Sequence, residues 1–143
     1  MHLNKEEIKK IIPHREPMLW VDEVIEMVPG ESIIARLTIA PDLDLFLGHF
    51  PGNPVLPGVL SVEAIAQVAD ILLLSLPRYN GTTPYFIGID EVRFKNKILP
   101  GDTVEIKASI KKEIPEKGIV TCEGEIRNGD LIAVVGLVTL AMR

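Results

Sequence analysis

The chain has little cysteine, and Cys122 is the only one among its 143 residues. A single cysteine excludes an internal disulfide and a thiolate metal cluster, which fits a reducing, cytoplasmic location. Cys122 falls on the apolar half of an alternating strand pattern, together with Val120, Gly124 and Ile126. We therefore expect a buried side chain there rather than a nucleophile.

Positive charge and long apolar runs are also scarce. The chain has 15 Lys and Arg against 20 Asp and Glu, a formal net charge of -5 and a pI of about 5.2, so a nucleic-acid partner is not expected. Residues 1–7 lack the apolar segment of a signal peptide, which predicts a protein that is not exported. The apolar stretches at 71–76 and 131–140 are too short to cross a bilayer, which takes about 20 residues per helix.

Local patterns predict an α+β protein that forms one domain over residues 1–143. Asn4 can cap a short helix over residues 4–12, with Glu7 at the capping-box position three residues later. Strands are expected over residues 19–27 and 32–40, joined as a hairpin, and four later strands should form an antiparallel meander. These four strands cover residues 85–95, 103–114, 118–127 and 131–142.

The centre of the chain combines a stiff loop with an apolar helix. Glycines and prolines recur through residues 48–58, GHFPGNPVLPG, and prevent a regular strand. Residues 59–76 are apolar around nearly the whole circumference, which is typical of a helix buried on all sides. We expect a curved sheet to wrap this helix. Because residues 131–140 are apolar on both faces, we also expect a homodimer whose sheet continues across a two-fold axis.

Candidate chemistry gathers around this helix. Glu63, Gln67 and Asp70 lie on one stripe, at offsets i, i+4 and i+7. A carboxylate in an apolar setting carries a desolvation cost, so Glu63 is either paired to a basic group or backbone amides, or is functional. His49 lies in the stiff loop, which could hold a general base rigidly. The amide of Gly58, at the helix start, could stabilise a carbonyl oxygen that gains negative charge.

The other histidines have weaker settings. His2 is close to the terminus, and His14 could simply pack or cap in its turn. Three scattered histidines and Cys122 lack the spacing of a zinc site. A base, an acid and an oxyanion site suit removal of a proton alpha to a thioester carbonyl with loss of a β-hydroxyl group. Spacing alone does not select this reaction over other acid/base chemistry.

Two adjoining motifs resemble those of the FabZ-type β-hydroxyacyl-acyl carrier protein dehydratases. They are GHFPGNPVLPGVL at residues 48–60 and VEAIAQ at residues 62–67. The resemblance spans nearly the whole chain, because further matches occur on both sides. These matches are PHREP at 13–17, VD at 21–22, GIDEVRF at 88–94 and PGD at 100–102. The resemblance implies a hotdog fold, in which a sheet wraps one long helix, and implies no metal or organic cofactor.

The resemblance also implies an activity and roles for four residues. The chain would convert (3R)-3-hydroxyacyl-acyl carrier protein to the trans-2-enoyl product in type II fatty acid synthesis. His49 would move the α-proton, and Glu63 would protonate or orient the departing water. The Gly58 amide would hold the thioester oxygen, and Gln67 would orient Glu63. In this family the histidine and glutamate of one site come from different subunits of a dimer, and a trimer of such dimers is a further option.

Departures from the family pattern leave alternatives open. Glu16, Met18 and Trp20 differ from the family's usual residues, which leaves acyl chain length and the pathway undetermined. Glu63 favours dehydration without isomerisation, because the bifunctional FabA-type enzymes usually have aspartate there, but it does not decide whether the double bond is also isomerised. The competing interpretations are a specialised dehydratase or isomerase of another acyl pathway, a hotdog thioesterase, and a noncatalytic acyl-binding module.

A basic row offers a contact for the acidic carrier protein. Arg93, Lys95 and Lys97 alternate along an expected strand and would share a face, with Lys111 or Lys112 as candidate additions. The alternative is a strand edge that carries lysines to block aggregation.

Overall fold

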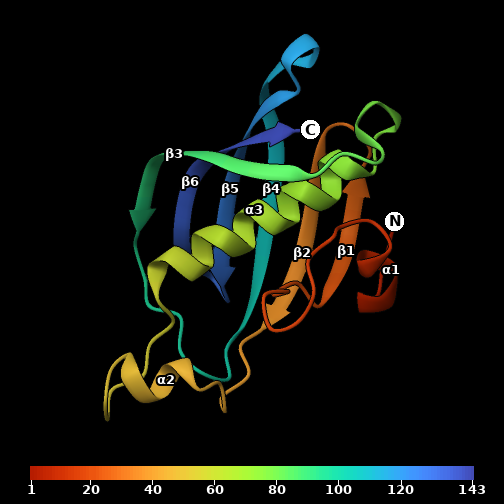
Figure 1. Cartoon of the computed structure of the whole chain (residues 1–143). Coiled ribbons are helices and arrows are strands. Elements are labelled where there is room, and N and C mark those ends of the chain that lie inside the picture. Colours follow the sequence, from red (N-terminus) through yellow and green to blue (C-terminus); the bar gives the residue numbers. More distant parts are fainter.

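The computed structural model describes residues 1–143 and contains six strands around one long helix. The strands are β1 (Glu23–Val28), β2 (Ser32–Thr38), β3 (Pro84–Phe94), β4 (Thr103–Ile114), β5 (Ile119–Asn128) and β6 (Leu131–Met142). The helices are α1 (Lys5–Lys9), α2 (Leu45–Gly48) and α3 (Gly58–Leu74), with 3₁₀ turns η1 (Pro77–Tyr79) and η2 (Pro115–Lys117). All strand pairs are antiparallel, and the curved sheet lies along α3 (Figure 1). The expected α+β arrangement is confirmed.

The strand order is β1-β2-β4-β5-β6-β3. Strands β4, β5 and β6 form the expected meander, but β3 pairs with β6 rather than with β4, so the prediction of a four-strand meander was wrong. After β3 the chain passes the start of α3, where the Leu56 amide donates to the Ile98 carbonyl (2.9 Å). This connection carries the chain to the opposite side of the helix, which alternation along a strand cannot reveal.

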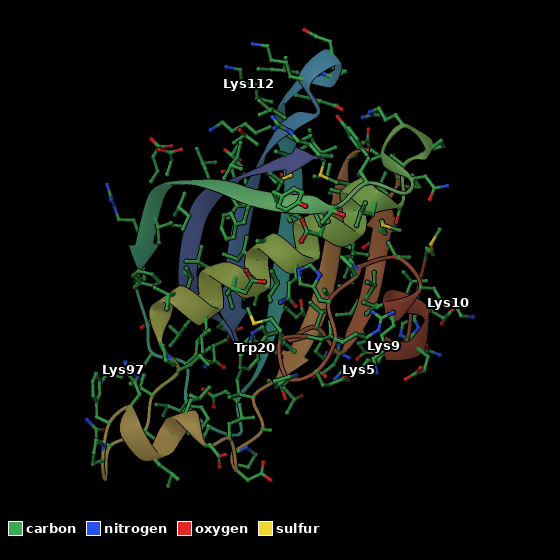
Figure 2. The ribbon with its side chains drawn as sticks, viewed as in Figure 1. Lys5, Lys9, Lys10, Trp20, Lys97 and Lys112 are labelled. Carbon is green, nitrogen blue, oxygen red and sulfur yellow. The ribbon has the colours of Figure 1, made fainter.

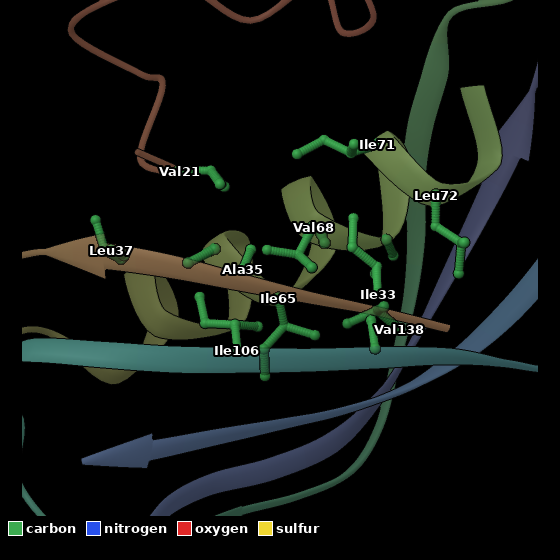
Figure 3. Close-up of a cluster of buried hydrophobic side chains, with 14 of the residues drawn as sticks. Val21, Ile33, Ala35, Leu37, Ile65, Val68, Ile71, Leu72, Ile106 and Val138 are labelled. Carbon is green, nitrogen blue, oxygen red and sulfur yellow. The ribbon is translucent and has the colours of Figure 1, made fainter. Parts of the chain in front are cut away.

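Helix α3 is buried along most of its length, with 13 of its 17 residues inaccessible. Ile65, Val68 and Ile71 pack against inward residues of the sheet such as Ile33 and Ile106 (Figure 3). This burial confirms a helix that is apolar around nearly its whole circumference and buried on most sides. A helix with so little exposed polar surface gains its stability from tertiary packing rather than from contact with water.

The helix packs tightly against the sheet at Gly124 of β5. A Cβ on Gly124 would lie 2.2 Å from Cγ2 of Ile65, far inside van der Waals contact. Cys122, on the same strand, is fully buried, as expected, and burial raises the pKa of its thiol to about 12. The inner face of β5 is therefore packing surface without a reactive thiol.

Most element boundaries agree with the sequence patterns. The capping box is present, because Asn4 Oδ1 accepts from the Glu7 amide (2.9 Å) and Glu7 Oε1 accepts from the Asn4 amide (3.1 Å). Strand β1 begins at Glu23 rather than at residue 19, because residues 15–20 form a turn against α3. The short helix α2 was not predicted. None of the helices has the length and apolar character needed to cross a membrane.

Candidate active site

The loop between α2 and α3 holds His49 in a defined orientation. Its Nδ1 lies 2.9 Å from the Val55 carbonyl, an acceptor that requires the proton on Nδ1. The amides of Phe50 and Asn53 donate to each other's carbonyls (3.0 and 2.7 Å), and the Phe50 ring stacks on the imidazole with centroids 3.9 Å apart. In the neutral ring Nε2 is then the unprotonated nitrogen, and it has no protein partner. The loop thus presents a basic nitrogen.

Glu63 lies on α3 with its side chain 19% exposed. The fully buried Gln67, one turn later, donates through Nε2 to Glu63 Oε2 and to the Met18 carbonyl, both at 2.8 Å. Gln67 Oε1 accepts from the Trp20 amide at 2.9 Å. Gln67 therefore ties the Glu63 carboxylate to the turn at residues 15–20.

His14 also reaches Glu63, a contact that the sequence analysis missed. Its Nε2 lies 3.9 Å from Glu63 Oε2 and 3.7 Å from Asp70 Oδ2. The sequence analysis offered packing or capping as the role of His14, and the structure adds that the turn brings its ring against the polar stripe of α3. The signal available in the sequence was the stripe itself, since a buried Asp70 needs a polar neighbour.

Burial shifts both of these neighbours toward their neutral forms. Desolvation lowers the pKa of His14; the charge of Glu63 opposes that shift, and Arg15 adds to it. Desolvation raises the pKa of Asp70 well above its usual value, and the charge of Glu63 raises it further. Asp70 consequently keeps its proton to a higher pH than an exposed aspartate does.

Gly58 begins α3 at the rim of a hollow of about 460 Å³. No hydrogen bond in the structure uses its amide, which points from the positive end of the helix. A Cβ at Gly58 would lie 2.7 Å from Cε1 of Phe94, so the absent side chain lets the Phe94 ring pack directly on the backbone. Val59 and Phe94 are 74% and 58% exposed, which leaves this rim apolar.

His49 and Glu63 are not joined by any hydrogen bond or ion pair within one chain. His49 bonds to its own loop, and Glu63 bonds to Gln67. Each group is therefore held separately by its own surroundings. No cluster of three or more His, Cys, Asp or Glu side chains is placed to hold a metal ion.

The basic row is not a single strand face, contrary to the sequence prediction. Strand β3 ends at Phe94, so only Arg93 belongs to it, while Lys95 and Lys97 follow in the connection and line the hollow beside Gly58. All three side chains are exposed, and none forms an ion pair with an acidic residue. Lys97 and Lys112 lie at opposite ends of the molecule (Figure 2), so Lys112 does not extend this group.

A long helix against a curved antiparallel sheet, with a histidine loop at the helix start, defines a hotdog-fold protein. Among solved structures, the fold resembles the dehydratase heterocomplex ApeI:P of Xenorhabdus doucetiae, with a TM-score of 0.79 and 20% identity over 95% of this chain and 90% of that chain. It also resembles Cj0977, a virulence protein of Campylobacter jejuni, with a TM-score of 0.68 and 12% identity over 96% and 89% of the two chains.

Sequence comparison defines the family more narrowly. The FabA-like domain family matches residues 12–135. A 3-hydroxyacyl-(acyl-carrier-protein) dehydratase FabZ of Oenococcus oeni is 51% identical over 106 residues, which cover 74% of this chain and 76% of that protein. The FabZ dehydratase of Clostridium perfringens is 42% identical over 134 residues, covering 87% and 96%. The chain belongs to the FabA-like family, and these curated relatives in it are FabZ dehydratases.

Proposed function

We propose that this chain, as one domain over residues 1–143, is a 3-hydroxyacyl-(acyl-carrier-protein) dehydratase of type II fatty acid synthesis. It removes water from a (3R)-3-hydroxyacyl thioester and yields the trans-2-enoyl thioester. The observation that carries this proposal is the free Nε2 of His49, which its own loop orients, in a chain 51% identical to a FabZ dehydratase over 106 residues.

His49 and Glu63 divide the proton transfers between them. The unprotonated Nε2 of His49 takes the proton from Cα, and the electron pair of that C–H bond forms the double bond as the Cβ–O bond breaks. The protonated carboxyl of Glu63 gives its proton to the departing hydroxyl, which leaves as water. Return of a proton from His49 to Glu63 through solvent restores the starting state. Gln67 keeps the Glu63 carboxyl group directed during this cycle.

The Gly58 amide stabilises the thioester oxygen. As Cα loses its proton, negative charge develops on the carbonyl oxygen, and the unused amide at the start of α3 donates to that oxygen. The adjoining hollow of about 460 Å³ accepts the part of the substrate next to the thioester.

Dehydration can be tested with a (3R)-3-hydroxyacyl-acyl carrier protein series, followed by the loss of the mass of water. We expect turnover by the wild type and a loss of at least about 100-fold in His49→Ala and in Glu63→Gln, the order expected for a positioned acid/base group. His2→Ala is the matched control, because it changes a histidine that is 62% exposed and pairs with Glu23 of β1, away from His49 and Glu63. Release of free thiol without loss of water would instead indicate a thioesterase.

The active unit in this proposal is a homodimer in which His49 and Glu63 of one site come from different subunits. Strand β3 is an edge of the sheet, and its Tyr85, Ile87 and Ile89 side chains are each more than half exposed. An unpaired edge with exposed apolar side chains favours pairing with a second copy.

Mixed dimers test the shared site. His49→Ala and Glu63→Gln subunits, unfolded and refolded together in equal amounts, form heterodimers with one intact and one doubly defective site. Random pairing should restore about a quarter of wild-type activity, since half of the dimers are mixed and half of their sites are intact. No recovery in dimers shown to be mixed would place both residues of a site in one chain.

Lys95 and Lys97, together with Arg93, form the proposed contact for the carrier protein. The chain carries a net charge of -5, so an acidic partner needs a local basic area. Lys95 and Lys97 line the hollow, and Arg93 lies two residues before Lys95 at the end of β3. Lys95→Glu with Lys97→Glu should raise KM for the carrier-bound substrate far more than for a short thioester analogue. Lys112→Glu, at the opposite end of the molecule, is the matched control. Equal effects on both substrates would contradict this contact.

A further inference from the structure

Behind Glu63 lies a buried polar group that the proposed acid/base cycle does not use. Asp70 is 3% exposed and stands two helical turns from Glu63, about 10.5 Å along the axis. The His14 ring fills the gap between them, with Nε2 at 3.9 Å from Glu63 Oε2 and 3.7 Å from Asp70 Oδ2. One imidazole nitrogen therefore faces both carboxyl groups.

The His14 ring is held in this place from both sides of the turn. Arg15 donates through Nη1 to the carbonyls of Ile12 (3.0 Å) and His14 (2.7 Å), and through Nη2 to the carbonyl of Lys9 (2.8 Å). Gln67 fixes the other end of the turn through Met18 and Trp20. The ring itself is only 18% exposed, so its position is set by the fold rather than by solvent.

The tautomer of His14 follows from its unpartnered atoms. Nδ1 of His14 is buried without a hydrogen-bond partner, as is Oδ1 of Asp70. Burial of an N–H donor without an acceptor costs more free energy than burial of an unpaired ring-nitrogen lone pair, because the N–H group can form a hydrogen bond only with an acceptor placed along its bond. The proton of the neutral ring therefore belongs on Nε2, the nitrogen that faces Glu63 and Asp70.

The charges around the cluster are few. The turn contributes His14 and Arg15, and α3 contributes Glu63 and Asp70. From β5, Cys122 faces Asp70 and is neutral, since the pKa of its thiol is raised to about 12. Desolvation lowers the pKa of His14 and raises that of Asp70, so neither adds its charge as readily as an exposed group does.

We propose that His14 is a positioning residue for Glu63, whose carboxylate it holds through a hydrogen bond from Nε2–H, with Asp70 as the second acceptor behind the ring. The inference rests on the proposed function only in giving Glu63 a catalytic role. A distance of 3.9 Å exceeds a hydrogen bond, so the proposed bond needs a small side-chain rotation of Glu63 toward His14. Because the bond favours ionised Glu63, removal of His14 makes Glu63 hold its proton to higher pH.

Carbon-13 NMR of labelled side-chain carboxyl groups tests the inference without any substrate. Glu63→Gln and Asp70→Asn assign the two signals in the folded, full-length protein. We expect the titration midpoint of Glu63 to rise by about one pH unit, tenfold in its ionisation equilibrium, in His14→Leu. His14→Gln, which keeps an N–H donor at a similar reach, should stay within about 0.3 unit of the wild type.

Several outcomes would overturn the inference. An unchanged Glu63 midpoint in His14→Leu would do so, as would equal shifts in the Leu and Gln variants. If His14→Leu does not fold, His14→Ala replaces it under the same expectations, and His2→Leu controls for loss of an exposed histidine. If His14 were merely structural, its replacement would lower the stability of the protein, and the Glu63 midpoint would shift equally in His14→Leu and His14→Gln.

Steady-state kinetics distinguish a failure of this inference from a failure of the proposed function. In an active wild type, the alkaline limb of the pH dependence of kcat should shift upward by about one pH unit in His14→Leu, because Glu63, the general acid, holds its proton to higher pH, and KM should stay within about twofold. His14→Gln should restore the wild-type profile. Absence of dehydration by the wild type would refute the proposed function, whereas the NMR titration would still decide the role of His14.

Discussion

Replacing Gln67 by methionine should weaken both the fold and the proposed catalysis. The amide of Gln67 makes three hydrogen bonds, to the Trp20 amide, the Met18 carbonyl and Glu63, at 2.8 to 2.9 Å. Methionine has a similar length but forms none of them. At about 0.5–1.5 kcal/mol for each of the three bonds, the free energy of unfolding should fall by about 1.5–4.5 kcal/mol.

A second substitution separates the contributions of these bonds. Gln67→Glu keeps an oxygen that can accept from the Trp20 amide, but it loses the donor to Glu63 and Met18 and places a second carboxyl group beside Glu63. We expect Gln67→Glu to retain more stability than Gln67→Met at pH 5, where a protonated side chain is accessible, and to lose that advantage at pH 8 as like charges repel.

Urea unfolding, followed by the fluorescence of the single tryptophan, Trp20, measures both variants. Protein concentration must be constant, because association contributes to the apparent stability of an oligomer. Dehydration of carrier-bound substrate below the unfolding transition should fall at least about tenfold in Gln67→Met, because Glu63 loses its orientation. If the free energy of unfolding of Gln67→Met is within about 0.5 kcal/mol of the wild type and its dehydration rate is within twofold, Gln67 does not orient Glu63 in the way that its hydrogen bonds indicate.

Three further outcomes follow from packing and titration. Gly124→Ala places a methyl group 2.2 Å from Cγ2 of Ile65 and should cost about 1–3 kcal/mol in urea unfolding, part of which Ile65→Leu recovers by removing that branch. Cys122, with its thiol pKa raised to about 12, should resist alkylation at pH 8 until urea unfolds the protein. The hydrogen bonds that Arg78 donates lower the pKa of Glu113 below its ordinary value of 4.5. The stability that these bonds confer is therefore present above pH 4.5 and is lost as the pH falls through the lowered pKa. In acid, the free energy of unfolding of Glu113→Gln in urea should approach that of the wild type.

A specific experimental result would contradict each of these three predictions. Gly48→Ala is the control for Gly124→Ala, because a Cβ at Gly48 meets no atom within 4 Å and should leave stability nearly unchanged. Equal costs at both glycines would mean that contact with Ile65 is not the cause. Rapid alkylation of the native thiol would contradict its burial, and a stability difference for Glu113→Gln that is constant with pH would contradict its lowered pKa.

Features encoded by neighbouring residues were predictable from the sequence. The stiff loop around His49 follows from its glycines and prolines, and α3 follows from a long, predominantly apolar stretch. The stripe formed by Glu63, Gln67 and Asp70 follows from helical periodicity alone. The structure adds that Gln67 bonds directly to Glu63, as the family resemblance implied.

Contacts between distant residues were not predictable in this way. The contact of His14 with Glu63 joins residues 49 positions apart, and nothing in the local pattern of the turn indicates it. The pairing of β3 with β6 depends on how far the sheet curls around α3, a tertiary property. The end of β3 at Phe94 separates Arg93 from Lys95 and Lys97, although their alternation alone favoured one continuous strand.

The position of α3 in the middle of the chain has a consequence for biosynthesis. Once Leu74 has been added, a largely apolar helix is complete, but the strands that cover it from one side continue to Met142. At a synthesis rate of about 5–20 residues per second, these strands follow only after several seconds. During that interval the apolar surface of α3 must be covered by the β1–β2 hairpin or by a chaperone, until β3 to β6 have been synthesised and can pack against it.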